Sequence, residues 1–125
     1  MENKVKILIA EDEVIIAQWL KLELEDIGYE VFDYVTTGEE AFNITQETPP
    51  DIVLLDISLS GEIDGIEAAS KIKDSLNIPI VFMTGYTESD IFESAQKVKP
   101  LAFLEKPVEI HTLKSVIDSY FSDKS

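Results

Sequence analysis

The chain has 125 residues and no cysteine, so it can form neither a disulfide framework nor a thiolate metal site. It also lacks an apolar run long enough to cross a bilayer, and no basic leader with an apolar core precedes the first predicted strand. We therefore expect a soluble cytoplasmic protein without membrane association. The absence of cysteine is compatible with a reducing compartment.

Basic residues are scarce, because 10 of them stand against 25 acidic residues and give a formal net charge of −15. Nucleic acid attracts Lys and Arg and is repelled by such a surface, so direct nucleic-acid binding is not expected. Most of the acidity is interpreted as a solvated surface. Some acidic residues, however, lie at the ends of predicted strands.

The 45% hydrophobic share predicts one compact domain over residues 1–125, with a core at 3–121 and a polar tail at 122–125. Apolar periodicity alternates between strand and helix along the whole chain. Strands are expected at 4–10, 29–35, 51–55, 78–83 and 101–104, and helices at 14–27, 38–47, 66–75, 89–97 and 108–121.

Local signals fix several of these boundaries. Gly28 is placed to close the first helix, because glycine tolerates the left-handed conformation common at helix ends. Thr37 and Glu40 form a capping-box pattern at the start of the second helix, and Pro49 and Pro50 end it. Residues 29–35 mix polar with apolar positions, as an edge strand does.

Strands that alternate with helices form a parallel sheet with helices on both faces. The expected fold class is therefore α/β, a flavodoxin-like, doubly wound, five-stranded parallel sheet of order 2-1-3-4-5 with five helices. Ligands of such sheets bind at the carboxyl ends of the strands. In this order the first and third strands are neighbours.

Polar residues follow four of the predicted strands where each one ends: Glu11 and Asp12, Asp56, Thr84 and Gly85, and Lys106 and Pro107. Carboxylates that converge on one crevice repel one another unless a cation neutralises them, and Mg²⁺ prefers such oxygen ligands. Each residue alone has an ordinary alternative role. Asp12 suits a helix cap, Asp56 a turn, Thr84 strand-end packing and Lys106 a solvated surface.

With these separated motifs, nearly the whole chain resembles a response-regulator receiver domain of two-component signalling. The strand order given above is also the order of that family, so the two expectations are not independent. The resemblance implies that Asp12 and Asp56 bind Mg²⁺ directly with the backbone carbonyl of Ser58, and that Glu11 acts through a water ligand of the ion.

The resemblance further implies that Asp56 is the phospho-acceptor. Lys106 and the Thr84 hydroxyl are then expected to contact phosphoryl oxygens, and Gly85 to offer its backbone N–H. The Lys106–Pro107 bond is expected to be cis.

Phe103 lies three positions before Lys106, where the family places an aromatic switch residue. An ordinary core aromatic is the alternative for Phe103. The switched surface would comprise the fourth helix, fifth strand and fifth helix, with the residues Ile91, Phe92, Val108 and Ile110.

The chain offers no phosphoryl source of its own. His111 is its single histidine and is interpreted as a surface residue, and no GxxxxGK nucleotide loop is present. The resemblance therefore implies a partner histidine kinase or phosphotransfer protein, and a downstream effector protein or fused output domain. Whether phosphorylation also produces a homodimer stays open.

We expect a signalling domain that catalyses only its own phosphorylation and dephosphorylation. One alternative is a degenerate receiver that serves as a protein-interaction module, although such a domain is expected to lose Asp56 or Lys106. The other is a Mg²⁺-dependent phosphatase with an aspartate nucleophile, but Ser58 stands where that class has a second Asp.

Two departures from the common family pattern concern the site itself. The stretch ISLSGEIDG after Asp56 is expected to form a loop one residue longer than usual. Glu11 stands where Asp is more frequent, and its longer side chain extends the reach toward a water ligand.

Overall fold

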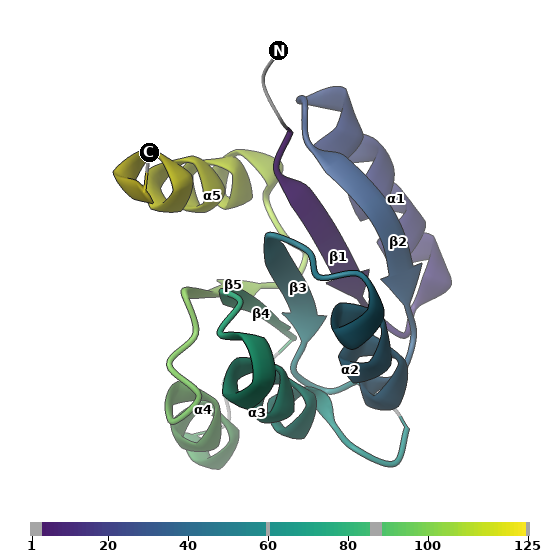
Figure 1. The fold of residues 1–125 in the computed structure, drawn as a ribbon, viewed down its shortest axis with the longest axis vertical. Helices are drawn as coiled ribbons and strands as arrows, with labels where there is room; N and C mark the ends of the chain where they lie inside the picture. The colour runs from purple at the N-terminus through teal and green to yellow at the C-terminus, as the bar shows by residue number, and fades with distance from the viewer. Residues whose placement is uncertain (1–3, 60, 86–88, 125) are drawn as a thin grey trace.

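The protein is described from a computed structural model, which covers residues 4–59, 61–85 and 89–124. Residues 3 and 125, which bound the expected core and tail, lie outside these ranges. Strands and helices alternate throughout (Figure 1): β1 (Lys6–Ala10), α1 (Val14–Asp26), β2 (Glu30–Val35), α2 (Gly38–Glu47), β3 (Ile52–Asp56), α3 (Gly65–Leu76), β4 (Ile80–Thr84), α4 (Ser89–Gln96), β5 (Ala102–Glu105) and α5 (Ile110–Lys124).

The strands form one parallel sheet of order β2-β1-β3-β4-β5, which confirms the expected fold class and strand order. β2 lies at an edge, as its mixed polarity predicted. The chain changes direction across the sheet between β1 and β3, so the carboxyl ends of these two strands lie side by side. Ligand crevices in open α/β sheets occur at this type of position.

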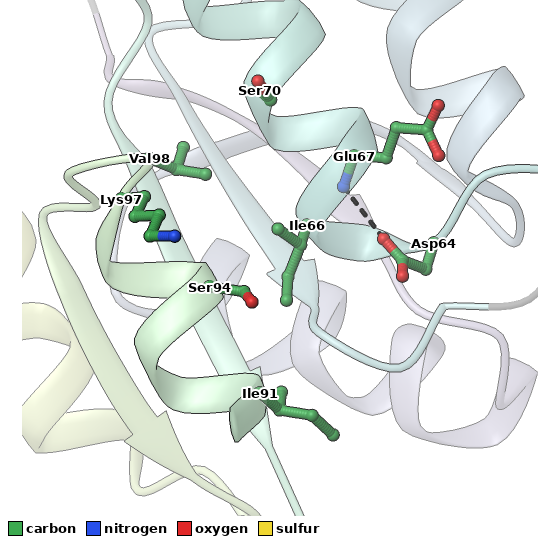
Figure 2. Close-up of a pocket in the computed structure, with 8 residues that line it drawn as sticks. All are labelled: Asp64, Ile66, Glu67, Ser70, Ile91, Ser94, Lys97 and Val98. Carbon is green, nitrogen blue, oxygen red and sulfur yellow. Dashed lines mark hydrogen bonds between the residues drawn. The ribbon is translucent and has the colours of Figure 1, made fainter. Parts of the chain in front are cut away.

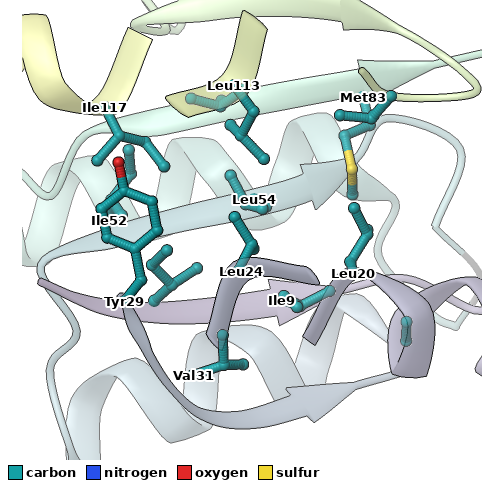
Figure 3. Close-up of a cluster of buried hydrophobic side chains, with 14 residues drawn as sticks. Ile9, Leu20, Leu24, Tyr29, Val31, Ile52, Leu54, Met83, Leu113 and Ile117 are labelled. Atoms are coloured by element: carbon teal, nitrogen blue, oxygen red, sulfur yellow. The ribbon is translucent and has the colours of Figure 1, made fainter. Parts of the chain in front are cut away.

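Two apolar clusters fill the space between the sheet and its helices. One packs α1 and α5 against the sheet and contains Ile9, Leu20, Leu24, Leu54 and Leu113, all fully buried (Figure 3). Burial of each such side chain contributes roughly 2 kcal/mol, and together they hold both helices on this face.

The second cluster lies on the opposite face, under α2, α3 and α4. It contains Leu8, Ala41, Leu55, Ile72 and Ala95. Successive strand residues point to opposite faces, so Leu8 and Ile9 serve different clusters although they are neighbours in the chain. Strands buried on both faces explain why the sequence shows continuous apolar runs rather than alternation.

The predicted helix signals are present in the structure. Gly28 has a positive φ of 105° and follows α1. The Thr37 hydroxyl accepts from the Glu40 backbone N–H, while the Glu40 carboxylate reaches back to the N–H of Thr36. The capping box is thus confirmed, with its return bond one residue further back than the simple pattern places it.

The last helix differs most from expectation. It begins at Ile110 rather than at residue 108, because the Glu109 side chain accepts from the Thr112 backbone N–H and so caps the helix. It continues to Lys124, which makes helical three residues that were expected in the polar tail. Val108, which was expected within this helix and on the switched surface, precedes the helix and is buried.

No helix within the described ranges is long and apolar enough to cross a membrane.

Candidate functional site

The residues at the strand ends meet at the carboxyl ends of the strands, on one side of the sheet. Glu11 directly follows β1, Asp56 and Thr84 end β3 and β4, and Lys106 directly follows β5. Oxygen atoms of the Glu11, Asp12 and Asp56 carboxylates lie within 4.8 Å of one another. The predicted convergence of three acidic side chains is therefore present.

Lys106 lies between two of these carboxylates. Its Nζ donates to Asp56 Oδ2 at 2.9 Å and lies 2.7 Å from Glu11 Oε1. The other Asp56 oxygen, Oδ1, accepts from the Ser58 backbone N–H at 2.9 Å. Asp56 is buried, and its carboxylate is contacted from two sides at the carboxyl ends of the strands, a position here called the acidic crevice.

Glu11 is fully buried and incompletely satisfied. Its Oε2 accepts from the Glu13 backbone N–H at 3.1 Å. Its Oε1 faces the charge of Lys106 but has no hydrogen-bond partner among the described residues. A buried acceptor without a hydrogen bond is costly, and it marks a place where a further donor or cation is favoured.

Burial raises the pKa of Glu11 to about 7, although the contact with Lys106 and the bond from Glu13 act in the opposite direction. The nearby charge of Asp56 raises this pKa further. For Lys106, burial alone would lower the pKa, but the contacts with Glu11 and Asp56 raise it above its usual value. The site therefore holds a firmly protonated ammonium beside more carboxylate charge than it can neutralise.

Asp12 is exposed, next to the buried Glu11 and Asp56. It does not cap α1, because the N-cap residue is Glu13 and that residue makes no side-chain cap bond. The alternative role for Asp12 as a helix cap is therefore wrong. Its carboxylate makes no hydrogen bond or ion pair within the described part of the chain and is available to a ligand.

Thr84 is buried at the end of β4, and Gly85 follows it at an exposed position. A Cβ atom at Gly85 would meet no described atom within 4 Å, so local packing does not require glycine there. The Lys106–Pro107 peptide bond is cis, as expected.

Phe103 is half-buried in β5 and lies between two other aromatic rings. Its ring centroid is 5.7 Å from that of Phe82 in the sheet and 4.5 Å from that of Phe92 on α4. These contacts connect the core beside Thr84 to α4 through Phe103. The geometry agrees both with a core aromatic and with a residue that transmits a change to α4.

The sequence interpretation missed residues around the loop that joins β3 to α3. A Cβ atom at Gly65 would lie 2.1 Å from the Asp56 carbonyl oxygen, so only glycine allows α3 to begin this close to Asp56. Glu39 of α2 accepts from the Ile63 backbone N–H in the same loop. Neither contact has a local sequence signature, because each joins different elements.

A separate groove of about 590 Å³ lies between α3 and α4 (Figure 2). Ile66, Ile91 and Val98 line it with Asp64, Glu67 and Lys97. It contains none of the three clustered carboxylates, and the Asp64 carboxylate is used to cap α3 at the Glu67 N–H. The three clustered carboxylates therefore lie outside this groove.

Comparison with known proteins agrees with this geometry. Residues 7–118 match the response regulator receiver domain family. The chain is 35% identical over 113 residues to the transcriptional regulatory protein PdtaR of Mycobacterium tuberculosis, with 90% of this chain and 55% of PdtaR covered. The chain thus spans about half the length of that relative.

Two further similarities extend over nearly the whole of both chains. Sporulation initiation phosphotransferase F of Bacillus subtilis is 32% identical over 121 residues, which cover 96% of each chain. The signal receiver domain of a modulated diguanylate cyclase from Desulfovibrio desulfuricans G20 superposes with a TM-score of 0.92 at 36% identity, over 98% of this chain and 97% of the other. The chain belongs to the receiver domain family of two-component response regulators, which is a family of signalling domains.

Proposed function

We propose that Asp56 accepts a phosphoryl group from a phosphohistidine of a partner kinase or phosphotransfer protein, with Mg²⁺ bound in the acidic crevice. The observation that carries this proposal is the placement of Asp56 beside Lys106, at 2.9 Å, within a cluster of three carboxylates. An aspartate carboxylate is an established type of covalent phosphoryl acceptor.

The residues present fit a hard divalent cation. The three carboxylates supply oxygen ligands, and Glu11 Oε1 is a buried oxygen that lacks a hydrogen bond. Asp12, Asp56 and the backbone carbonyl of Ser58 would hold the ion, and Glu11 would act through water. When bound, Mg²⁺ supplies positive charge that offsets the carboxylates and the incoming phosphoryl oxygens.

The side chains around Asp56 have distinct tasks in the transfer. An Asp56 carboxylate oxygen forms a bond to phosphorus while the bond from phosphorus to the partner's imidazole nitrogen breaks, and the electron pair of that bond stays on the nitrogen. Lys106 transfers its contact from the carboxylate to a phosphoryl oxygen and stabilises the negative charge there. Thr84 donates its hydroxyl to another phosphoryl oxygen, and Gly85 contributes its backbone N–H.

The signal then leaves through α4, β5 and α5. Movement of the Thr84 hydroxyl toward the phosphoryl group changes the space beside Phe103, whose ring already contacts Phe92 of α4. Ile91 and Ile110, both half-buried, belong to the surface that this change alters. A downstream effector or a fused output domain reads that surface.

Residues 1–125 act in this proposal as one receiver unit in the cytoplasm. It catalyses only its own phosphorylation and dephosphorylation, and it binds no nucleic acid directly. Its acidic surface, with a net charge of −15, supports the last point.

Intact-mass measurement after incubation with Mg²⁺ and a small acyl phosphate tests the proposal. The expected result is a labile gain of one phosphoryl group, lost in Asp56→Asn and kept in Asp74→Asn, which changes an exposed aspartate on α3. No gain despite bound Mg²⁺ would indicate an interaction module. Sustained hydrolysis of phosphomonoesters would indicate a phosphatase.

A further inference from the structure

We propose that Glu39 is a positioning residue for the metal site, because from α2 it holds the loop between β3 and α3 against Asp56. This inference rests on the proposed function, since it concerns the loop that carries Ser58. No feature of the sequence pattern around Glu39 assigns it this task, which follows from contacts between distant segments.

The central contact joins residues that are 24 positions apart. The Ile63 backbone N–H donates to Glu39 Oε1 at 3.1 Å. The neighbouring Gly38 lies against the same loop residue, because a Cβ atom there would be 2.5 Å from the Ile63 carbonyl oxygen. The first turn of α2 is therefore in direct contact with the second half of the loop.

Gly61 brings the loop beneath the Glu39 carboxylate. It has a φ of +112°, and a Cβ atom at this position would lie 2.5 Å from Glu39 Oε1. Glycine thus allows both the backbone conformation and the close approach. Glu39 thus contacts the second half of the loop at two positions, Gly61 and Ile63.

Both ends of the loop are attached to Asp56. At the start, the Ser58 N–H donates to Asp56 Oδ1. At the end, α3 begins at Gly65, against the Asp56 carbonyl oxygen. Glu39 holds the loop at Gly61 and Ile63, which lie between these two attachments.

This support matters because Mg²⁺ requires near-ideal octahedral geometry at roughly 2.1 Å, so a small shift of a ligand oxygen weakens binding. The Ser58 carbonyl belongs to the loop that Glu39 holds through Ile63. Loss of outer groups that orient metal ligands typically weakens metal affinity by about 10- to 100-fold. Glu39 acts through several backbone bonds, so we expect an effect near the lower end of this range.

Glu39 also has an ordinary alternative role, since an acidic residue in the first turn of a helix stabilises the helix dipole. Two conservative variants separate the roles. Glu39→Gln keeps an acceptor oxygen at the same reach but removes the charge. Glu39→Asp keeps the charge but shortens the side chain by one methylene, which draws the carboxylate away from Ile63.

Calorimetric titration of each purified variant with Mg²⁺ tests whether Glu39 positions the metal site. Glu39→Asp is expected to bind roughly 10-fold more weakly than wild type, and Glu39→Gln within about twofold of it. Glu47→Gln, at the exposed far end of α2, removes the same charge and is expected to change nothing. In metal-free protein, hydrogen exchange of the Ile63 amide is expected to be about 10-fold faster in Glu39→Asp alone.

The positioning role of Glu39 would be overturned if Glu39→Asp bound Mg²⁺ with wild-type affinity, or if Glu39→Gln and Glu39→Asp lost Mg²⁺ affinity equally. Neither result would affect phosphorylation of the wild type, so the proposed function would stand. Absence of Mg²⁺ binding by the wild type itself would instead reject the proposed function.

Discussion

Two clusters of lysine and carboxylate lie at opposite ends of the strands and differ in how well their charges are neutralised. In the acidic crevice, Lys106 faces Glu11 and Asp56 together. In the second cluster, here called the Asp118 cluster, the Tyr29 hydroxyl donates to Asp118 Oδ1 and the Lys114 ammonium contacts Oδ2. Tyr29 directly precedes β2 and therefore lies at the amino end of that strand, whereas the acidic crevice lies at the carboxyl ends of the strands.

The pKa values shift in opposite directions in the two clusters. Burial raises the pKa of Glu11 to about 7. The hydrogen bond from Lys114, together with that from Tyr29, lowers the pKa of Asp118 below its usual value. A half-exposed carboxylate that has a lysine of its own thus stabilises the fold, whereas a fully buried carboxylate that shares its lysine with a second carboxylate marks a site where a further cation is favoured.

Removal of the lysine from each cluster should give the largest difference. Lys106→Ala leaves two buried carboxylates without their cation, so we expect a loss of about 3 kcal/mol in the free energy of unfolding and a roughly 100-fold slower phosphorylation. Lys114→Ala breaks a half-exposed pair and should cost at most about 0.5 kcal/mol, with no change in phosphorylation. Urea unfolding and intact-mass time courses measure both quantities. Equal losses in the two variants would remove the distinction between the clusters.

The pH dependence of stability should also have opposite signs. Between pH about 4.3 and about 7, the folded metal-free protein keeps a proton on Glu11 that the unfolded chain has released, so stability falls as pH rises. This loss is on the order of 3 kcal/mol and should be absent in Glu11→Gln.

The lowered pKa of Asp118 acts the other way. It contributes stability above the unfolded value of about 3.9, and that stability is lost as pH falls below it. The contribution is smaller, because Asp118 is half exposed and its charge is screened. Urea unfolding at several pH values should show the Asp118 slope disappear in Asp118→Asn. Identical pH profiles for wild type and both variants would show that neither carboxylate is perturbed.

Tyr29→Phe should have a much smaller effect than Lys106→Ala. It removes one hydrogen bond to Asp118, while the buried ring and the Lys114 contact remain. We expect a loss of about 1 kcal/mol in the free energy of unfolding and unchanged phosphorylation. A change in the phosphorylation rate would show instead that the Asp118 cluster is coupled to the crevice.

The alternation of strands and helices was predictable because the strands are buried on both faces and the helices carry apolar stripes, both of which are local patterns. Capping was predictable at α2, where Thr37 and Glu40 lie close in sequence. The start of α5 was not, because it depends on the Glu109 side chain bonding forward to Thr112 rather than on periodicity. For the same reason Val108 was expected inside this helix, although it precedes it.

In the site, the convergence of Glu11, Asp12 and Asp56 followed from strand order, since strand ends were all that needed to be located. The direct contact of Glu11 with Lys106 did not, because it depends on side-chain directions across the two strands, β3 and β4, that separate β1 from β5. Glu39 escaped prediction because its partner lies in another element, and a single hydrogen bond between elements leaves no periodic signal.

Calorimetric titration with Mg²⁺ of the wild type, Asp12→Asn and Asp118→Asn tests most directly whether the unsatisfied crevice is a cation site. We predict that wild type and Asp118→Asn bind a single ion with equal affinity, and that Asp12→Asn binds it at least about 10-fold more weakly. Equal affinity in all three proteins, or no binding by the wild type, would contradict the account.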